Sequence, residues 1–341
     1  MSIYNKLFDI VYYEFPDPLK QLMFYLPLEL KLGGRVFRET YNFIKATEFL
    51  PREKLVKIQE KLLKKILMYA VSKVPFYKRL GITVSSTDNA FKIIRKFPII
   101  DKELIKQNPG LFISTDISKM KVYHTSTGGT TGVKLGLYIN VDAFAKEWAF
   151  MIRMWERAGY RLGDKVVTFR GVKIKGVSKG IYWQVQSLYN ALEMSPFHLN
   201  YETAPLYIRK IIEWKPKFLH GYPSAITLLA KFVKEFSIEK FPRIRAVLLT
   251  SENIYPWQRK LIEEAFNTRV FSWYGQTEKI VLAGECEYST LYHVYPQYGF
   301  MELVDENGEP IDADEEGEIV GTSFLNPVSY THLTLPTTER V

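Results

Sequence analysis

From about Tyr123 onward, short β-rich runs alternate with segments of helical periodicity, and this alternation restricts the fold more than any other feature. The β-rich runs are Lys165–Arg170, Phe218–His220, Ala246–Thr250 and Arg269–Trp273. The helical segments between them are Tyr207–Glu213, Ala225–Glu235 and Pro256–Phe266. Strands joined through helices pair in parallel and are covered on both faces. The pattern therefore predicts an α/β fold with at least one mostly parallel sheet.

Roughly the first hundred residues have helical spacing instead. Leu55, Ile58, Leu62 and Ile66 fall on one face of a predicted helix, and the lysines of Lys54–Lys65 form its solvated face. Val74-Pro75 ends this helix, because proline disfavours helical geometry in the residue before it. Asp101 is a predicted N-cap of a further short helix. We expect residues 1–100 to form a helical lead that belongs to the same structural domain as an α/β core of residues 101–327.

The last part of the chain reads first as a hairpin and then as an unpatterned tail. Tyr298–Asp305 alternates, Glu306–Gly308 predicts a turn, and Gly317–Gly321 predicts the returning strand. Val328–Thr337 follows without helical or strand periodicity, and it resembles the in-frame translation of a transposon-end sequencing adapter. We therefore expect the native sequence to stop near Pro327 and residues 328–341 to be a non-native tail.

Composition excludes several classes of protein. The chain of 341 residues is 47% hydrophobic and 24% charged, which is typical of a globular protein and not of a disordered one. A single cysteine, Cys286, excludes a disulfide framework. The first residues lack a signal peptide, and no strongly apolar run approaches the roughly 18 residues that a membrane span needs. These features predict a cytoplasmic protein without a membrane span.

The formal charge of +9 raises the question of a nucleic-acid partner. The basic residues, however, are spread along the chain, and their densest stretch is the helical face of Lys54–Lys65. We therefore expect no nucleic-acid partner.

The first chemical motif is Thr125–Lys134, with the sequence TSTGGTTGVK. Glycines let backbone N–H groups surround an anion, hydroxyls add donors, and a lysine adds a point charge, so this composition suits a polyphosphate. The Walker pattern is absent, because no Gly-Lys-Ser/Thr occurs here. A flexible polar loop is the alternative interpretation. The candidate binding residues are Thr125, Ser126, Thr127, Gly128, Gly129, Thr130, Thr131, Gly132 and Lys134.

The second motif, Trp273–Glu278, directly follows an apolar strand. Strand ends followed by tight glycine turns are where α/β folds place ligands. Tyr274 offers a stacking face before Gly275, Thr277 offers a hydroxyl to a phosphate, and Glu278 offers a hard oxygen to Mg²⁺. An ordinary strand-to-helix turn is the alternative.

Together the two motifs resemble the adenylate-forming (acyl/aryl-CoA synthetase) superfamily, and within it the phenylacetate–coenzyme A ligase and capsule-biosynthesis (CapK-like) branch. Ala70–Tyr77, Phe97–Lys102, Gly221–Ser224 and Gly317–Thr322 are similar to that branch and occur in the expected order. The resemblance covers roughly residues 55–327. It implies the large N-terminal domain of the adenylate-forming fold, with layered sheets, packed helices, a helical lead and a C-terminal β-hairpin region.

The resemblance also implies roles for individual residues. Thr125–Lys134 would hold the β- and γ-phosphates of ATP. Tyr274 would lie against adenine, Thr277 would contact the α-phosphate and Glu278 would bind Mg²⁺. The catalytic residues would be Thr277, Glu278 and Lys134. Ser251 and Glu252 would line the nucleotide pocket, where Asn253 replaces the usual proline. A small-molecule carboxylic acid would form an acyl-adenylate and pass to a thiol, usually coenzyme A.

The same resemblance implies parts that the sequence does not contain. Relatives carry a ribose-binding aspartate just beyond the position of Asn326-Pro327, followed by a hinge and a small C-terminal domain that supplies a lysine. We expect this small domain to be absent and the chain, as a truncated fragment, to have little or no ligase activity.

Two other functions and one metal site stay open. The chain could transfer the acyl group to a carrier-protein thiol or an amine in surface-polysaccharide synthesis, or it could be a non-enzymatic basic module that binds phosphates. Cys286 and His293, with Glu285 or Glu287 nearby, are candidate zinc ligands, although one cysteine and one histidine are an incomplete set. A buried thiol and a surface imidazole are the alternative. The sequence predicts neither the acid nor the oligomeric state.

Overall fold

The computed structural model describes Leu32, residues 34–126, 135–186, 189–311 and 315–327, and the backbone of 332–335. The described residues before 122 are helical or irregular. The helices of this part are α4 (Gly34–Thr47), α5 (Arg52–Lys73), α6 (Pro75–Arg79), α7 (Ala90–Ile94) and α8 (Lys102–Gln107), with short 3₁₀ turns η2 (Pro109–Phe112) and η3 (Ile117–Lys119). The predicted helical lead is therefore confirmed where the structure describes it, and helical turns continue to Lys119. The predicted domain boundaries stay a prediction.

Two local predictions in this region are confirmed. Helix α5 ends at Lys73, and α6 begins at Pro75, whose missing N–H costs nothing in the first turn of a helix. Asp101 caps α8, because its carboxylate accepts a hydrogen bond from the backbone N–H of Leu104 at 2.7 Å.

An eight-stranded sheet forms the centre of the molecule, in the order β10-β9-β8-β7-β6-β3-β5-β4. The pairs β5–β3, β3–β6, β6–β7 and β7–β8 are parallel, and the outer strands β4, β9 and β10 are antiparallel. The predicted mostly parallel sheet is thus confirmed. Its strands are β3 (Val166–Phe169), β4 (Trp183–Gln186), β5 (Ala191–Met194), β6 (Phe218–Gly221), β7 (Ala246–Thr250), β8 (Val270–Gly275), β9 (Leu282–Gly284) and β10 (His293–Val294).

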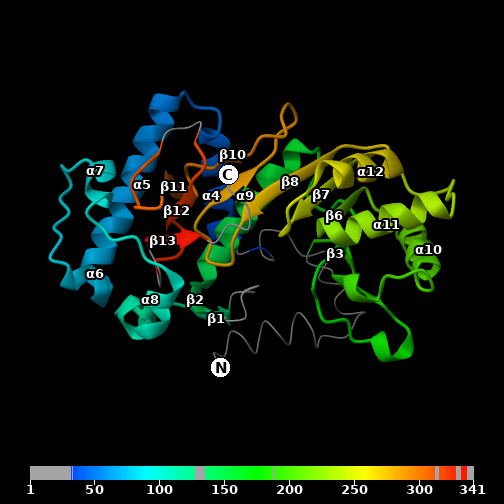
Figure 1. Cartoon of the computed structure of the whole chain (residues 1–341), viewed down its shortest axis with the longest axis horizontal. Coiled ribbons are helices and arrows are strands. Elements are labelled where there is room, and N and C mark those ends of the chain that lie inside the picture. Colours follow the sequence, from blue (N-terminus) through cyan, green and yellow to red (C-terminus); the bar gives the residue numbers. More distant parts are fainter. Residues whose placement is uncertain are drawn as a thin grey trace.

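Each face of this sheet contributes to a separate core. Val166, Phe218 and Leu248 pack with α9 (Val141–Arg157) and the N-terminal helices. Val167 and Leu219, which alternate with them, pack with α10 (Ala204–Trp214), α11 (Pro223–Glu235) and α12 (Pro256–Phe266). Figure 1 shows α5–α8 at one end of the molecule and α10–α12 at the other.

Two smaller sheets complete the fold. Strands β1 (Val122–Ser126) and β2 (Gly136–Asn140) form a pair, and β11 (Gly299–Val304), β12 (Glu318–Ser323) and β13 (His332–Leu335) form a three-stranded sheet. The hairpin of β11 and β12 was predicted. Strand β13 was not predicted, although His332–Leu335 alternates polar and apolar residues; it pairs with the otherwise open edge of β12.

The direction of the chain reverses beside β3. The chain leaves β3 toward β5, whereas it leaves β6, the other neighbour of β3, toward β7. Ligands of open α/β sheets bind outside the carboxyl ends of strands at such a switch point. The two strands approach closely there, because a Cβ on Gly221 would lie 2.4 Å from the carbonyl oxygen of Phe169. This position therefore requires glycine.

None of the described helices is both long and apolar enough to cross a membrane.

Candidate nucleotide-binding site

The second motif lies at the carboxyl end of β8, as predicted. Tyr274 and Gly275 are the last residues of the strand, and Gln276–Lys279 turn toward β9. The Tyr274 hydroxyl and the Gln276 side-chain amide are buried near each other, and neither the hydroxyl nor the amide nitrogen has a further hydrogen-bond partner among the described residues. Burial also raises the pKa of Tyr274. Unpaired buried polar atoms at a strand end fit a site that a ligand completes.

Glu278, the predicted magnesium ligand, is paired with a lysine from another part of the chain. Its side chain is only 6% exposed, and its carboxylate lies 3.3 Å from the ammonium of Lys102 in the first turn of α8. Lys102 belongs to the segment Phe97–Lys102, whose position in the sequence suggested the resemblance. The structure therefore joins that segment directly to the motif.

The next residue, Lys279, is held by a different helix. Its ammonium forms an ion pair with Glu147 of α9, and the Tyr298 hydroxyl donates a hydrogen bond to the other carboxylate oxygen at 3.2 Å. The ammonium also lies 4.6 Å from the centre of the Phe144 ring. Lys279 has a left-handed backbone with φ of 58°, which is unfavourable for a residue with a side chain. Its ion pair and this backbone geometry fix the end of the turn.

The strand pair that carries the first motif is linked to this turn through the end of β12. Asn326 accepts a hydrogen bond from the Asn140 N–H and donates one to the Tyr138 carbonyl, both at 3.0 Å. The Asn326 N–H in turn donates to the Ser323 hydroxyl, which donates to the Lys279 carbonyl at 2.7 Å. Ser323 and Asn326 are buried. Two buried polar side chains thus hold the β1–β2 pair to the turn after β8, although the two are far apart in the sequence.

The structure describes only the two ends of the predicted phosphate loop. Thr125 and Ser126 are the last residues of β1, and Ser126 pairs with Gly136 at the start of β2. The remaining predicted residues, Thr127, Gly128, Gly129, Thr130, Thr131, Gly132 and Lys134, lie outside the described residues. Their roles therefore stay predictions.

Ser251 and Glu252 follow β7, the parallel neighbour of β8, so they lie beside the second motif. Ser251 has a left-handed φ of 68°. Glu252 accepts hydrogen bonds from the N–H and the hydroxyl of Ser224, at 3.0 and 2.9 Å. A carboxylate in this position also interacts favourably with the N-terminus of α11. Glu252 therefore connects the ends of β6 and β7, and its predicted contact with the nucleotide stays a prediction.

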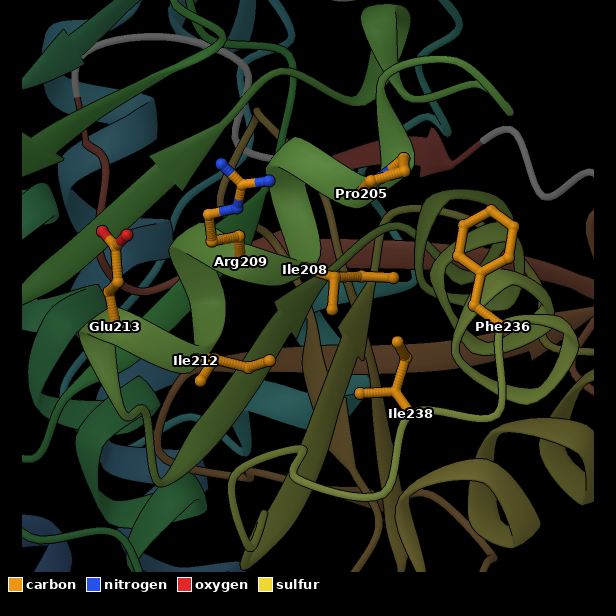
Figure 2. Close-up of a pocket in the computed structure, with 7 residues that line it drawn as sticks. All are labelled: Pro205, Ile208, Arg209, Ile212, Glu213, Phe236 and Ile238. Atoms are coloured by element: carbon orange, nitrogen blue, oxygen red, sulfur yellow. The ribbon is translucent and has the colours of Figure 1, made fainter.

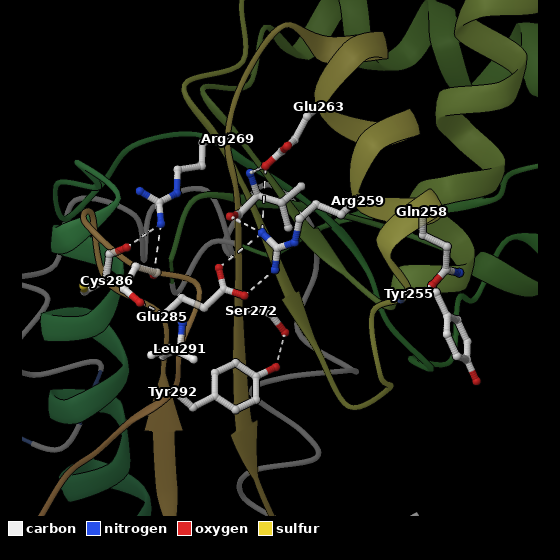
Figure 3. A network of polar contacts seen from close by, with 12 residues as sticks. Tyr255, Gln258, Arg259, Glu263, Arg269, Ser272, Glu285, Cys286, Leu291 and Tyr292 are labelled. Atoms are coloured by element: carbon white, nitrogen blue, oxygen red, sulfur yellow. Dashed lines mark hydrogen bonds and ion pairs between the residues drawn. The ribbon is translucent and has the colours of Figure 1, made fainter. Parts of the chain in front are cut away.

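The candidate zinc ligands lie at the β9–β10 edge of the sheet: Cys286 follows β9, and His293 begins β10. Figure 3 shows the polar contacts around Cys286. Cys286 is buried, and its sulfur accepts a hydrogen bond from the Tyr288 N–H at 3.4 Å, whereas His293 is exposed in β10. The neighbouring carboxylates are engaged elsewhere: Glu285 forms an ion pair with Arg259 of α12, and Glu287 pairs with Arg157 at 2.8 Å.

Arg269 completes this polar network by donating to the backbone carbonyls of Cys286, Glu287 and Ser289. Among the described residues, no three histidine, cysteine, aspartate or glutamate side chains form a group that could hold a metal ion. The predicted zinc site therefore has no support in this part of the structure, and the network instead fastens the β9–β10 hairpin to α12.

An apolar hollow of about 470 Å³ lies along α10 and the end of α11 (Figure 2). Its lining residues are Pro205, Ile208, Arg209, Ile212, Glu213, Phe236 and Ile238. None of them is a predicted site residue, so the polar atoms at the strand ends, and not this hollow, define the candidate site.

Four residues that the sequence interpretation did not assign to the site belong to it: Lys102, Glu147, Ser323 and Asn326. Lys102 stood within a segment that already indicated the family, so its position was a usable signal. Glu147 gave no such signal, because it lies 132 positions from its partner Lys279 on an ordinary amphipathic helix.

Comparison with known proteins supports the sequence interpretation. No family model matches the chain. Over 187 residues it is 29% identical to the protein CapK of Staphylococcus aureus, a match that covers 54% of this chain and 41% of CapK. Over 291 residues it is 26% identical to the phenylacetate-coenzyme A ligase of Thermus thermophilus, which covers 81% of this chain and 63% of that enzyme. The predicted resemblance is confirmed. The chain spans less than two thirds of each of these two relatives.

The fold prediction is confirmed by a solved structure. An open conformation of 2-hydroxyisobutyryl-CoA ligase, in complex with 2-HIB-AMP and CoA, superimposes with a TM-score of 0.64 and 17% identity. The match covers 84% of this chain and 69% of the ligase. At this identity the similarity establishes the shared fold, which is the adenylate-forming fold of CoA ligases.

Proposed function

We propose that this chain activates a carboxylic acid with ATP and transfers the acyl group to coenzyme A. The observation that carries the proposal is the buried link through Ser323 and Asn326, which holds the β1–β2 pair against the turn after β8. That link supports a site shared by the two predicted phosphate-binding motifs, because the first motif connects β1 to β2 and the second forms the turn after β8. The similarity to a phenylacetate-coenzyme A ligase supports the choice of an acid and a thiol as substrates.

The proposed reaction has two displacement steps. A carboxylate oxygen of the acid attacks the α-phosphorus of ATP, and pyrophosphate leaves with the electrons of the broken P–O bond. The thiol sulfur, after loss of its proton, then attacks the acyl carbon, and AMP leaves. Neither step needs a protein nucleophile, so the protein must mainly orient the reactants and offset developing charge.

Under this proposal, Tyr274 lies against adenine, Thr277 donates to the α-phosphate, and Thr125–Lys134 surrounds the outer phosphates. Gly275 and Thr277 are exposed, which leaves them accessible to a nucleotide. Ser251 and Glu252 border the same pocket from β7.

A magnesium ion would neutralise phosphate charge when bound, and Glu278 fits the hard-oxygen ligand that such an ion needs. The carboxylate is buried beside Lys102, so it is already held in an electrostatically defined position. The ion pair with Lys102 restricts the rotation of the Glu278 side chain.

The CoA ligase neighbours favour coenzyme A over a carrier-protein thiol or an amine as the acceptor. A purely phosphate-binding module would not require the second motif or its link to the first. Under this proposal the reaction takes place in the cytoplasm.

Two measurements test the proposal. Mg·ATP should raise the melting temperature of the protein, and Lys134→Ala and Tyr274→Ala should each remove most of that rise. Acid-dependent pyrophosphate release, which we expect to be slow for this chain, should follow the same order among the variants. Lys260→Ala, on the exposed side of α12, serves as a control and should bind Mg·ATP like the wild type. If Mg·ATP leaves the wild-type melting temperature unchanged, the proposed function is wrong.

A further inference from the structure

The loop between β3 and β4 carries four positive charges within ten residues. Arg170, Lys173, Lys175 and Lys179 are all exposed, and among the described residues none of these side chains has a salt-bridge or hydrogen-bond partner. The sequence contains no aspartate or glutamate between Asp164 and Glu193. This loop, which we call the basic loop, is therefore not neutralised by acids of its own segment.

The basic loop begins at the switch point of the sheet. The Gly171 N–H donates a hydrogen bond to the Tyr222 hydroxyl at 3.1 Å, and Tyr222 directly follows β6. A Cβ on Gly171 would lie 3.8 Å from the ring of Phe197, which is itself 76% exposed. The start of the loop is thus fixed between the carboxyl ends of β3 and β6, where ligands of such sheets bind.

The basic loop and the Tyr274–Glu278 turn lie at the same edge of the sheet but not side by side. Strands β3 and β8 are separated by β6 and β7, so their ends are about 14 Å apart at roughly 4.8 Å per strand spacing. A small acid whose carboxylate lies at the Tyr274–Glu278 turn does not extend along the basic loop, whereas a long one can.

We propose that the acid activated by this chain is an extended polycarboxylic acid, one carboxylate of which lies at the Tyr274–Glu278 turn while the others lie along the basic loop. This inference rests on the proposed function and names its substrate class. Exposed cations in water favour a multiply charged ligand, because each contact alone is weak and several must act together. The exposed loop also lets a long ligand continue into solvent.

Binding of N-acetylated pentaglutamate tests the inference, since five extended residues span roughly 16 Å. Pentaglutamine is the neutral probe of equal length, and phenylacetate is the small acid. Two fourfold variants are compared. The loop variant is Arg170→Gln/Lys173→Gln/Lys175→Gln/Lys179→Gln, and the control variant is Lys54→Gln/Lys57→Gln/Lys61→Gln/Lys65→Gln. The control removes the same charge from exposed positions of α5, at the other end of the molecule (Figure 1).

We expect the Kd for pentaglutamate to rise at least about tenfold in the loop variant, because each lost surface ion pair weakens binding by roughly two- to fivefold. The control should stay within about twofold of wild type, and pentaglutamine should bind none of the three detectably. Equal weakening in both variants, or none in the loop variant, would overturn the inference. So would tighter binding of a ten-residue oligothymidylate with the same dependence on the basic loop, since that result would indicate a nucleic-acid surface.

Mg·ATP stabilisation separates this inference from the proposed function. Because the basic loop is remote from Tyr274, wild type and loop variant should gain the same rise in melting temperature from Mg·ATP. Loss of that rise in wild type would contradict ATP use, whatever the pentaglutamate result. A normal rise with loop-independent pentaglutamate binding would refute only the substrate class.

Discussion

The Lys102 ammonium lies 3.3 Å from the Glu278 carboxylate and so joins the first turn of α8 to the turn after β8. The lysine side chain is 24% exposed and the glutamate side chain 6%. A charge that is largely removed from water depends on its partner, because the lost hydration is not otherwise replaced. The pair therefore makes the geometry of the candidate site depend on the helical N-terminal part of the protein.

Removing Lys102 should destabilise the protein. In Lys102→Met the Glu278 carboxylate stays buried without its partner, so we expect the free energy of unfolding in urea to fall by roughly 3 kcal/mol at pH 7. Lys102→Arg should retain most of the stability. The double variant Lys102→Met/Glu278→Gln should recover part of the loss, since no uncompensated charge remains. A single variant as stable as wild type would show that the pair is dispensable.

Substitutions in the cluster of Glu147, Lys279 and Tyr298 should lower the free energy of unfolding by different amounts. Glu147→Gln removes the counter-charge of Lys279 and should cost roughly 3 kcal/mol, whereas Tyr298→Phe removes one hydrogen bond to a charged group and should cost about 1.5 kcal/mol. Urea unfolding gives both values. Because Lys279 directly follows Glu278, Glu147→Gln should also reduce the stabilisation by Mg·ATP more than Tyr298→Phe does. The reverse order would contradict the assigned contacts.

The side chain of Asn326 should stabilise the protein because it both accepts a hydrogen bond from β2 and donates one to β2. Asn326→Ala leaves the Asn140 N–H and the Tyr138 carbonyl without their partner and should lower the unfolding free energy by about 2 kcal/mol. Asn326→Asp keeps the acceptor for Asn140 but loses the donor to Tyr138. Hydrogen exchange of the β2 amides should therefore accelerate in both variants, and equal protection in Asn326→Ala and wild type would argue against the link.

His220 should make stability depend on pH. It lies in β6 between Trp155 and Trp273, and burial, followed by the charge of Arg170, lowers its pKa well below 6.5. As the pH falls through 6.5, the unfolded chain takes up a proton there and the folded chain does not, so stability present above that pH is lost below it. Between pH 7.5 and 5.5, wild type should lose roughly 1.4 kcal/mol more than His220→Gln. Parallel stability profiles would refute this.

Cys286 offers a chemical probe of the β9–β10 hairpin, because it is the sole cysteine of the chain and is buried. Labelling by a thiol reagent should be slow in wild type and should accelerate at least about tenfold in Arg269→Met, which loses the donors to three hairpin carbonyls. Arg243→Met, an exposed substitution before β7, is the control and should label at the wild-type rate. Unchanged labelling in Arg269→Met would mean that other contacts close the hairpin.

The elements that the sequence predicted correctly are those with strong local periodicity. Helix α5 buries one stripe of apolar residues. Each of the strands β3, β6, β7 and β8 buries a continuous, mostly apolar run. Both patterns are visible within a few residues of sequence. Strand β13 alternates over only four residues, His332–Leu335, and its pairing is set by the open edge of β12. Long-range pairing of this kind leaves no mark within a short window of sequence.

The candidate site shows the same division. Tyr274 and Gly275 were placed correctly at a strand end, because an apolar run followed by glycine defines that end locally. The partners of Glu278 and Lys279 could not be predicted, since an ion pair depends on which helices the fold brings beside the turn. Asn326 was quoted only as a landmark, yet it joins the β1–β2 pair to the turn after β8.

The narrow approach of β3 and β6 at Gly221 has a consequence for how this protein could change. No side chain fits where Gly221 faces Phe169, so the ends of β3 and β6 meet through main chain that substitution can hardly reshape. New ligand preferences must instead arise in the segments that follow these strands, such as the basic loop, where length and charge can vary without disturbing the sheet. A lineage of such proteins could therefore diversify its substrates while its scaffold stayed constant.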